Sequence, residues 1–135
     1  MISQEKLRKY VDIIEKYDMK SRVCIIEHNN RVIEIVMYIE KEIKVANNSY
    51  FLVYGAYNSD VCLKLFPSLN SDTEWLTINE ALKCSEALKN CALMCKEINN
   101  LRIPFNAYES IEFIELLRKE YLRRGKRLNI DKSNR

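Results

Sequence analysis

The sequence predicts an all-α protein, a bundle of five to six helices that ends in an antiparallel pair of capped helices. Three observations lead to this prediction. Glycine and proline are scarce, with two residues of each in a chain of 135, which favours long regular elements over special turns. The N-terminal segment carries apolar residues at helical spacing. The last third of the chain contains two patterns that are typical of helix starts.

The first expected helix spans residues 3–18. Its apolar residues recur at intervals of three and four, which places them on one face; they are Leu7, Tyr10, Val11, Ile14 and Tyr17. Ser3 is suited to cap this helix, because its hydroxyl can accept a hydrogen bond from a free backbone N–H of the first turn. The segment lacks the apolar stretch of a secretory signal peptide, so we expect a cytoplasmic protein.

Residues 21–66 allow two interpretations. As a helix from Ser21 to Val45, the segment has one apolar stripe, formed by Val32, Ile35, Val36, Ile39 and Ile43. As strands, it has runs rich in β-branched and aromatic residues, which asparagine-rich turns separate. The helical interpretation underlies the all-α prediction. The alternative is an α+β fold, in which a β-meander at 21–66 is packed by N- and C-terminal helices.

A helix is expected to begin at the capping box formed by Thr77 and Glu80. In this motif the two side chains accept hydrogen bonds from backbone N–H groups that have no partner inside the helix. The apolar side of the helix carries Ala81, Leu82, Leu88, Cys91, Cys95 and Ile98. Asparagines at 99–100 are expected to end it.

A second helix is expected to begin at Asn106 and Glu109, which repeat the capping pattern. Its buried face is predicted to carry Ser110, Phe113, Ile114, Leu117 and Tyr121. Gly125 then occupies a position suited to the glycine that follows a helix. Because a short connector favours antiparallel neighbours, these two helices should pack as a pair. We expect a single domain at 1–125, followed by a basic, flexible tail at 126–135.

The C-terminal segment 118–135 is the strongest electrostatic feature. It has eight Lys or Arg residues and two acids, a net charge of +6, whereas the whole chain carries +3. The helix dipole accounts for cations in a last helical turn, and a charge asymmetry of this kind also indicates a binding surface. An acidic protein partner or nucleic acid is therefore expected to contact Arg118, Lys119, Arg123, Arg124, Lys126 and Arg127.

Arg22 and His28 stand in the pattern R-x5-H. This pattern resembles the Arg-x(4–6)-His signature of the HEPN nuclease superfamily, whose members are four-helix domains. The resemblance implies metal-independent RNA cleavage, usually across a homodimer, with Arg22 and His28 as the catalytic pair and Asn29 as a polar neighbour. Histidine suits such a role because its pKa lies near neutrality. The alternative interpretation is a histidine that caps or packs against a helix.

The stretch from Cys91 to Leu117 resembles the last two helices of the poxviral Bcl-2-like proteins. Those proteins are small cytoplasmic helical bundles that bind host signalling or death proteins. The resemblance implies a third possible function, protein binding through an apolar groove of a helical bundle. Such a function predicts a contiguous exposed apolar patch.

The cysteines do not form a metal-binding motif. There are five, an odd number without a CxxC pair, which predicts reduced thiols in the cytoplasm. Cys84, Cys91 and Cys95 share one helical face, but structural zinc needs four close ligands. Small cysteines also suit close helix packing. We therefore expect no metal and no cofactor.

Two further patterns bear on function. Tyr50, Tyr54 and Tyr57 form a stripe at helical spacing, which is typical of a core or an interface and can also stack nucleic-acid bases. The apolar run 50–57 is too short to span a bilayer. The chain contains none of the common catalytic or phosphate-loop motifs. The leading hypothesis is therefore a non-enzymatic interaction or regulatory protein that acts through its basic end.

Overall fold

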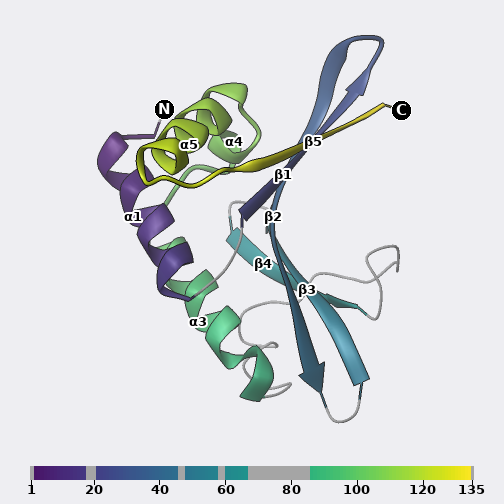
Figure 1. Cartoon of the computed structure of the whole chain (residues 1–135), viewed down its shortest axis with the longest axis vertical. Coiled ribbons are helices and arrows are strands. Elements are labelled where there is room, and N and C mark those ends of the chain that lie inside the picture. The colour runs from purple at the N-terminus through teal and green to yellow at the C-terminus, as the bar shows by residue number, and fades with distance from the viewer. Residues whose placement is uncertain (1, 18–20, 46–47, 58–59, 67–85, 135) are drawn as a thin grey trace.

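The computed structural model describes residues 2–17, 21–45, 48–57, 60–66 and 86–134. Its elements are α1 (Gln4–Lys16), β1 (Ser21–His28), β2 (Arg31–Val45), β3 (Asn48–Tyr57), β4 (Asp60–Phe66), α3 (Glu86–Asn100), α4 (Phe105–Tyr108), α5 (Ile111–Arg123) and β5 (Asn129–Asn134). The protein is therefore α+β, and the prediction of an all-α bundle is wrong. Helices gather on one side of a five-stranded sheet (Figure 1).

The segment 21–66 forms strands for reasons that are present in its sequence. Val and Ile are frequent in it, and branched side chains pack well on a pleated surface. Asn29 and Asn30 adopt positive φ angles of 50° and 62°, as a tight two-residue hairpin turn requires. The residues of the expected helical stripe do not share one face of β2, because Val32 is 41% exposed and Ile35 only 8%. Residues of opposite parity lie on opposite faces of a strand.

The strand order is β4-β3-β2-β1-β5. The first four strands form an antiparallel meander, as the alternative interpretation of 21–66 proposed. The long strand β2 pairs with β1 over residues 31–39 and with β3 over residues 40–45. The two hairpins that share β2 extend in opposite directions, upward and downward in Figure 1.

The fifth strand comes from the segment predicted to be a basic tail. Residues Asn129–Asn134 form β5, which pairs in parallel with β1 from Arg22↔Asn129 to Glu27↔Asn134. A parallel neighbour must enter the sheet from the same end as β1. The return of the chain past α5 satisfies this requirement and places the cations near residue 127 beside the start of β1.

The helix α1 forms the centre of the helical layer. Ser3 caps it as predicted, with its hydroxyl oxygen accepting a hydrogen bond from the Lys6 N–H at 3.2 Å. Both α5 and α3 pack against α1, so the expected antiparallel pair of the last two helices does not describe this layer. Tyr10 of α1 contacts Tyr108 and Phe113 through tilted or edge-on rings, which is a favourable arrangement for aromatic side chains.

Local predictions for the last third are partly confirmed. The helix α3 ends at Asn100 as expected, whereas its predicted capping box at Thr77 and Glu80 lies outside the described residues. The pattern at 106–109 does not start the last helix, because α4 stops at Tyr108. Instead Ser110 caps α5, and its hydroxyl oxygen accepts a hydrogen bond from the Phe113 N–H at 3.1 Å. Of the residues predicted to be buried on this helix, Phe113, Ile114, Leu117 and Tyr121 are buried, whereas Ser110 is only partly buried.

The sheet excludes the folds that the two family resemblances implied. Each resemblance implied a domain built only of helices, and a five-stranded sheet is incompatible with both. Arg22 and His28 lie on β1 rather than on a helix. Cys91 lies on α3 and Leu117 on α5, two helices that pack on a third helix beside the sheet.

Candidate functional site

Five of the six cations predicted to bind a partner fall into two groups. Arg123, Arg124 and Lys126 form ion pairs with carboxylates of α1 and α5. Arg118 and Arg127 instead line an open groove beside β5. Lys119 is exposed and forms no ion pair with any residue that the structure describes. The predicted surface is thus divided between a structural network and a groove.

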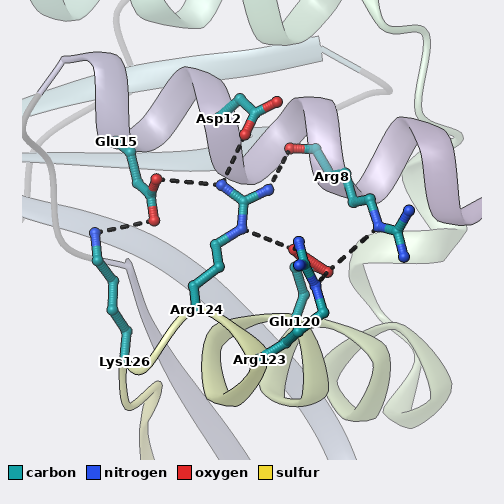
Figure 2. Close-up of polar contacts among 7 residues, drawn as sticks. All are labelled: Arg8, Asp12, Glu15, Glu120, Arg123, Arg124 and Lys126. Carbon is teal, nitrogen blue, oxygen red and sulfur yellow. Dashed lines mark hydrogen bonds and ion pairs between the residues drawn. The ribbon is translucent and has the colours of Figure 1, made fainter.

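Arg124 is the centre of the network (Figure 2). Its guanidinium donates hydrogen bonds to Asp12 at 2.7 Å, Glu15 at 3.2 Å and the backbone carbonyl of Arg8 at 3.3 Å, all on α1. It also donates to Glu120 on its own helix at 2.7 Å. Burial alone lowers the pKa of Arg124, but the hydrogen bonds with these carboxylates outweigh burial and raise it. This side chain therefore links α5 to α1.

Glu120 is the buried carboxylate of the network, with 6% of its surface exposed. Arg123 donates two hydrogen bonds to it, at 2.9 and 2.6 Å, and Arg8 forms a third ion pair at 3.5 Å. These hydrogen bonds, from Arg123 first and then Arg124, lower the pKa of Glu120 to about 2 despite its burial. Charged hydrogen-bond donors stabilise the ionised form, so Glu120 is a carboxylate at neutral pH.

A glycine turn separates the network from the groove. Gly125 has a φ of +73°, and the Lys126 N–H donates to the Tyr121 carbonyl at 2.8 Å while the Gly125 N–H donates to Leu122 at 3.0 Å. These two bonds form a Schellman motif, the helix ending that the sequence predicted at Gly125. Lys126 pairs with Glu15 at 2.9 Å just after the turn. The chain then reaches Arg127 on the groove side.

The groove has a volume of about 840 Å³ and lies where α5, β1 and β5 meet. It is lined by Arg22, Arg118, Leu122, Arg127, Leu128, Asn129, Ile130 and Asp131. Three arginines from three different parts of the chain therefore surround one hollow. With Asp131 as the one acid among these lining residues, the lining carries a net charge of +2.

The three arginines differ in their partners. Arg22 donates to Asp131 at 2.7 Å, across the pairing of β1 with β5. Arg118 donates to Glu115 at 2.7 Å, one turn earlier on α5, and is half exposed. Arg127 is exposed and forms no ion pair with the described residues. Exposed ion pairs of this kind contribute little stability, so Arg118 can exchange Glu115 for an external anion at small cost.

One wall of the groove is apolar. Leu122 is 62% exposed, the most exposed of the large apolar side chains in the described structure. It lies one helical turn after Arg118, on the same face of α5. Leu128 and Ile130 continue this wall from the connector into β5. The groove thus combines guanidinium groups with an apolar surface, and none of its described lining residues is aromatic.

The structure does not bring Arg22 and His28 together as a catalytic pair. The two residues lie at opposite ends of β1, and a rise of about 3.3 Å per residue separates them by roughly 20 Å. Arg22 faces the groove, whereas His28 is exposed beside the hairpin turn at Asn29. Arg22 is therefore a groove residue. The R-x5-H pattern had singled it out as a catalytic residue instead.

The other predicted constellations do not form a site in the described structure. Cys91 and Cys95 are buried on α3, where burial first and then the nearby thiols Cys91 and Cys62 raise the pKa of Cys95. A raised pKa keeps this thiol protonated and unreactive. No group of metal-ligating side chains occurs among the described residues, and Cys84 lies outside them. The three tyrosines expected to share a helical stripe lie on the strand β3.

Sequence reasoning missed five groove residues, which are Leu122, Leu128, Asn129, Ile130 and Asp131. Asp131 was counted only as an acid within the basic segment, and Leu122 lies outside the predicted buried face of the last helix. An apolar residue off the buried face of an amphipathic helix is the signal that could have identified Leu122. No comparable signal identifies Asp131, because its partner Arg22 is 109 residues away.

Comparisons with known proteins provide no relative for this chain. No protein-family profile matches it, and neither the curated proteins nor the solved structures include a match. Among the described helices, none is both long and apolar enough to cross a membrane. The functional argument therefore depends on the groove itself.

Proposed function

We propose that this chain is a non-enzymatic interaction protein that binds an acidic segment of a partner protein in the groove between α5 and β5. The observation that supports this function is the convergence of Arg22, Arg118 and Arg127 on one apolar-walled hollow. Guanidinium groups bind carboxylates through paired, charge-assisted hydrogen bonds. Arginine is also the charged residue most often found at the centre of protein interfaces.

The lining favours an acidic peptide over nucleic acid. Leu122 and Ile130 can receive apolar side chains, whereas single-stranded nucleic acid is usually bound on aromatic rings that stack its bases. Asp131 in the groove and Glu115 beside it would repel a continuous phosphate backbone. A peptide can place its acids at Arg118 and Arg127 and a neutral residue near Asp131.

A cytoplasmic setting is part of this proposal. The described cysteines Cys24, Cys62, Cys91 and Cys95 are free thiols, which persist in the reducing cytoplasm. The groove would there recognise an acidic segment of another protein and thereby act as a regulatory or adaptor surface. None of the groove residues needs to act as an acid, base or nucleophile in this role.

The proposal is tested by fluorescence anisotropy with a labelled twelve-residue peptide of alternating Glu and Val. We expect saturable binding that weakens as salt is raised, because the contacts are charge-dependent. Arg118→Ala and Arg127→Ala should each weaken binding by about tenfold, since a charge-assisted hydrogen bond contributes roughly 1.5 kcal/mol or more. Lys96→Ala is the matched control, because Lys96 is an exposed cation on α3 away from the groove.

Two results would contradict the proposal. The first is that Arg118→Ala and Arg127→Ala bind the peptide as tightly as the parent chain does. The second concerns a labelled fifteen-nucleotide oligothymidine as a competing probe. If the oligonucleotide binds through the same arginines and the peptide does not bind, the partner is nucleic acid and the acidic-peptide function is wrong.

A further inference from the structure

The two edge strands of the sheet, β4 and β5, differ in whether their outer backbone groups have a hydrogen-bond partner. At the β4 edge, the carboxamide of Asn99 on α3 accepts a hydrogen bond from the Val61 N–H at 2.7 Å and donates one to the Val61 carbonyl at 3.3 Å. Asn99 thus occupies the position of a neighbouring strand. At the other edge, β5 is the last strand, and no described element pairs with its outer side. An open strand edge presents backbone donors and acceptors to a further strand.

The open edge borders the groove. Asn129, Ile130 and Asp131 are the first three residues of β5, and all three line the hollow. Arg118 and Leu122 form the facing wall on α5. The groove therefore lies between α5 and the first residues of β5, whose outer edge is open, and it also reaches Arg22 on β1. Several peptide-binding domains hold an extended segment in such a place, where main-chain bonds provide affinity and side-chain contacts provide specificity.

We propose that the partner's acidic segment binds as an additional strand along β5. This inference rests on the proposed function and specifies its binding mode: an extended peptide whose backbone pairs with Asn129–Asn134. Side chains on one face of a strand recur about every 6.8 Å. A peptide with an acid at every second position therefore directs its carboxylates to one side, toward the arginines of the groove.

Cations without an ion-pair partner in the described part of the chain lie beside the open edge of β5. Arg127 precedes β5 and Lys132 lies within it, and neither forms an ion pair with the described residues. Arg118 borders the groove from α5. Positive groups therefore lie beside the beginning of the open edge and at Lys132, with Asp131 between Arg127 and Lys132 in the sequence. This pattern is complementary to a segment in which acids alternate with neutral or apolar residues.

A second copy of the chain is a poorer occupant of this edge. Two identical strands that pair about a two-fold axis place the residue on the axis opposite its own copy. An axis at Asp131 would oppose two carboxylates, and an axis at Lys132 would oppose two ammonium groups. Like charges directly across a strand pair are destabilising. These two registers of self-pairing are therefore unfavourable, whereas an acidic chain meets cations at Arg127 and Lys132.

Backbone methylation of the peptide tests this mode separately from its charge. Two versions of the Glu-Val peptide are compared with the parent peptide, one N-methylated at every Val and the other at every Glu. Their N–H groups point to opposite edges of an extended strand. We expect one version to lose at least tenfold in affinity and the other to bind within about threefold of the parent peptide.

An equal effect of the two methylation patterns, whether retention or loss, would overturn strand addition. The proposed function would survive that result, provided that the parent peptide still binds and Arg127→Ala still weakens it. Absence of binding by the parent peptide would instead overturn the function itself. Hydrogen exchange of the backbone amides gives a second measurement. Bound peptide should slow exchange at every second amide of β5. The same change at all amides of β5 would contradict strand addition.

Discussion

Two groups of cations at the basic end of the chain differ in what surrounds them. Arg123, Arg124 and Lys126 meet carboxylates of α1 and α5, so their charges are neutralised within the fold. Arg118 and Arg127 border an open groove. All five lie within ten consecutive residues, and local charge does not separate them. The comparison shows that the fold brings acids of α1 to one group of cations and leaves the other group at an open groove, where the proposed binding surface lies.

The largest expected effect is on the network side. Arg124→Ala removes one partner each from Asp12, Glu15 and the buried Glu120 at once. Glu120 keeps Arg123 and Arg8, but because three charge-assisted hydrogen bonds are lost, two of them between α5 and α1, we expect the free energy of unfolding in urea to fall by roughly 2–4 kcal/mol. Equal stability of Arg124→Ala and Arg127→Ala would remove the distinction between the two groups.

Glu120 provides a pH test of the same distinction. Its pKa is about 2 in the folded protein against an ordinary value of 4.5, so the ionised carboxylate stabilises the fold above about pH 4.5. That contribution is lost as the pH falls toward 2. Glu120→Gln should lower the free energy of unfolding by roughly 1–3 kcal/mol at pH 7. The difference from the parent chain should shrink in acid, and a difference that is unchanged at pH 2.5 would contradict this account.

Gly125 lies between the two groups of cations in the chain. Its substitution should lower stability by an amount between those expected for Arg124→Ala and Arg127→Ala. A Cβ at this position would meet no atom within 4 Å, so the cost of Gly125→Ala is the strain of a φ of +73°, about 1–2 kcal/mol. Asn tolerates this conformation better, and Gly125→Asn should recover part of the loss in thermal unfolding. Equal loss with Ala and Asn would indicate that the space around Gly125, rather than its φ angle, is limiting.

The smallest effect on stability is expected on the groove side. Arg127 is exposed and has no described ion-pair partner, so Arg127→Ala should change the free energy of unfolding by no more than about 0.5 kcal/mol. Binding of the acidic peptide should nevertheless weaken by about tenfold, as measured by anisotropy. A variant that loses stability and affinity together would place Arg127 in the structural group.

Much of the local structure could be predicted from the sequence. Ser3 as a helix cap and Gly125 as the residue after the last helix depend on contacts within one turn. The apolar faces of α1 and α5 follow from residues three and four apart. The last capping pattern was wrong because Ser110, not Asn106, accepts the first-turn hydrogen bond. Both side chains can cap, and the N–H that Ser110 accepts from belongs to Phe113, which is buried in the core.

The candidate site was predicted less completely. Arg118 and Arg127 were among the expected binding residues, but Arg22 was expected to act with His28 on a helix. The groove depends on the parallel pairing of β1 with β5, which joins Arg22 to Asp131 across 109 residues. A pairing at that separation leaves no periodic signal in either segment.

By itself the sequence determined the Ser3 cap, the helix end at Gly125, the buried faces of α1 and α5 and the concentration of cations after residue 117, because these features depend on neighbours within a few positions. The tertiary structure alone decided that 21–66 is a meander, since apolar runs of that length satisfy either period until a partner strand is present. It also decided which cations are available. Acids of α1 lie opposite Arg124, more than 100 residues away in sequence, whereas the side chain of Arg127 faces an open groove.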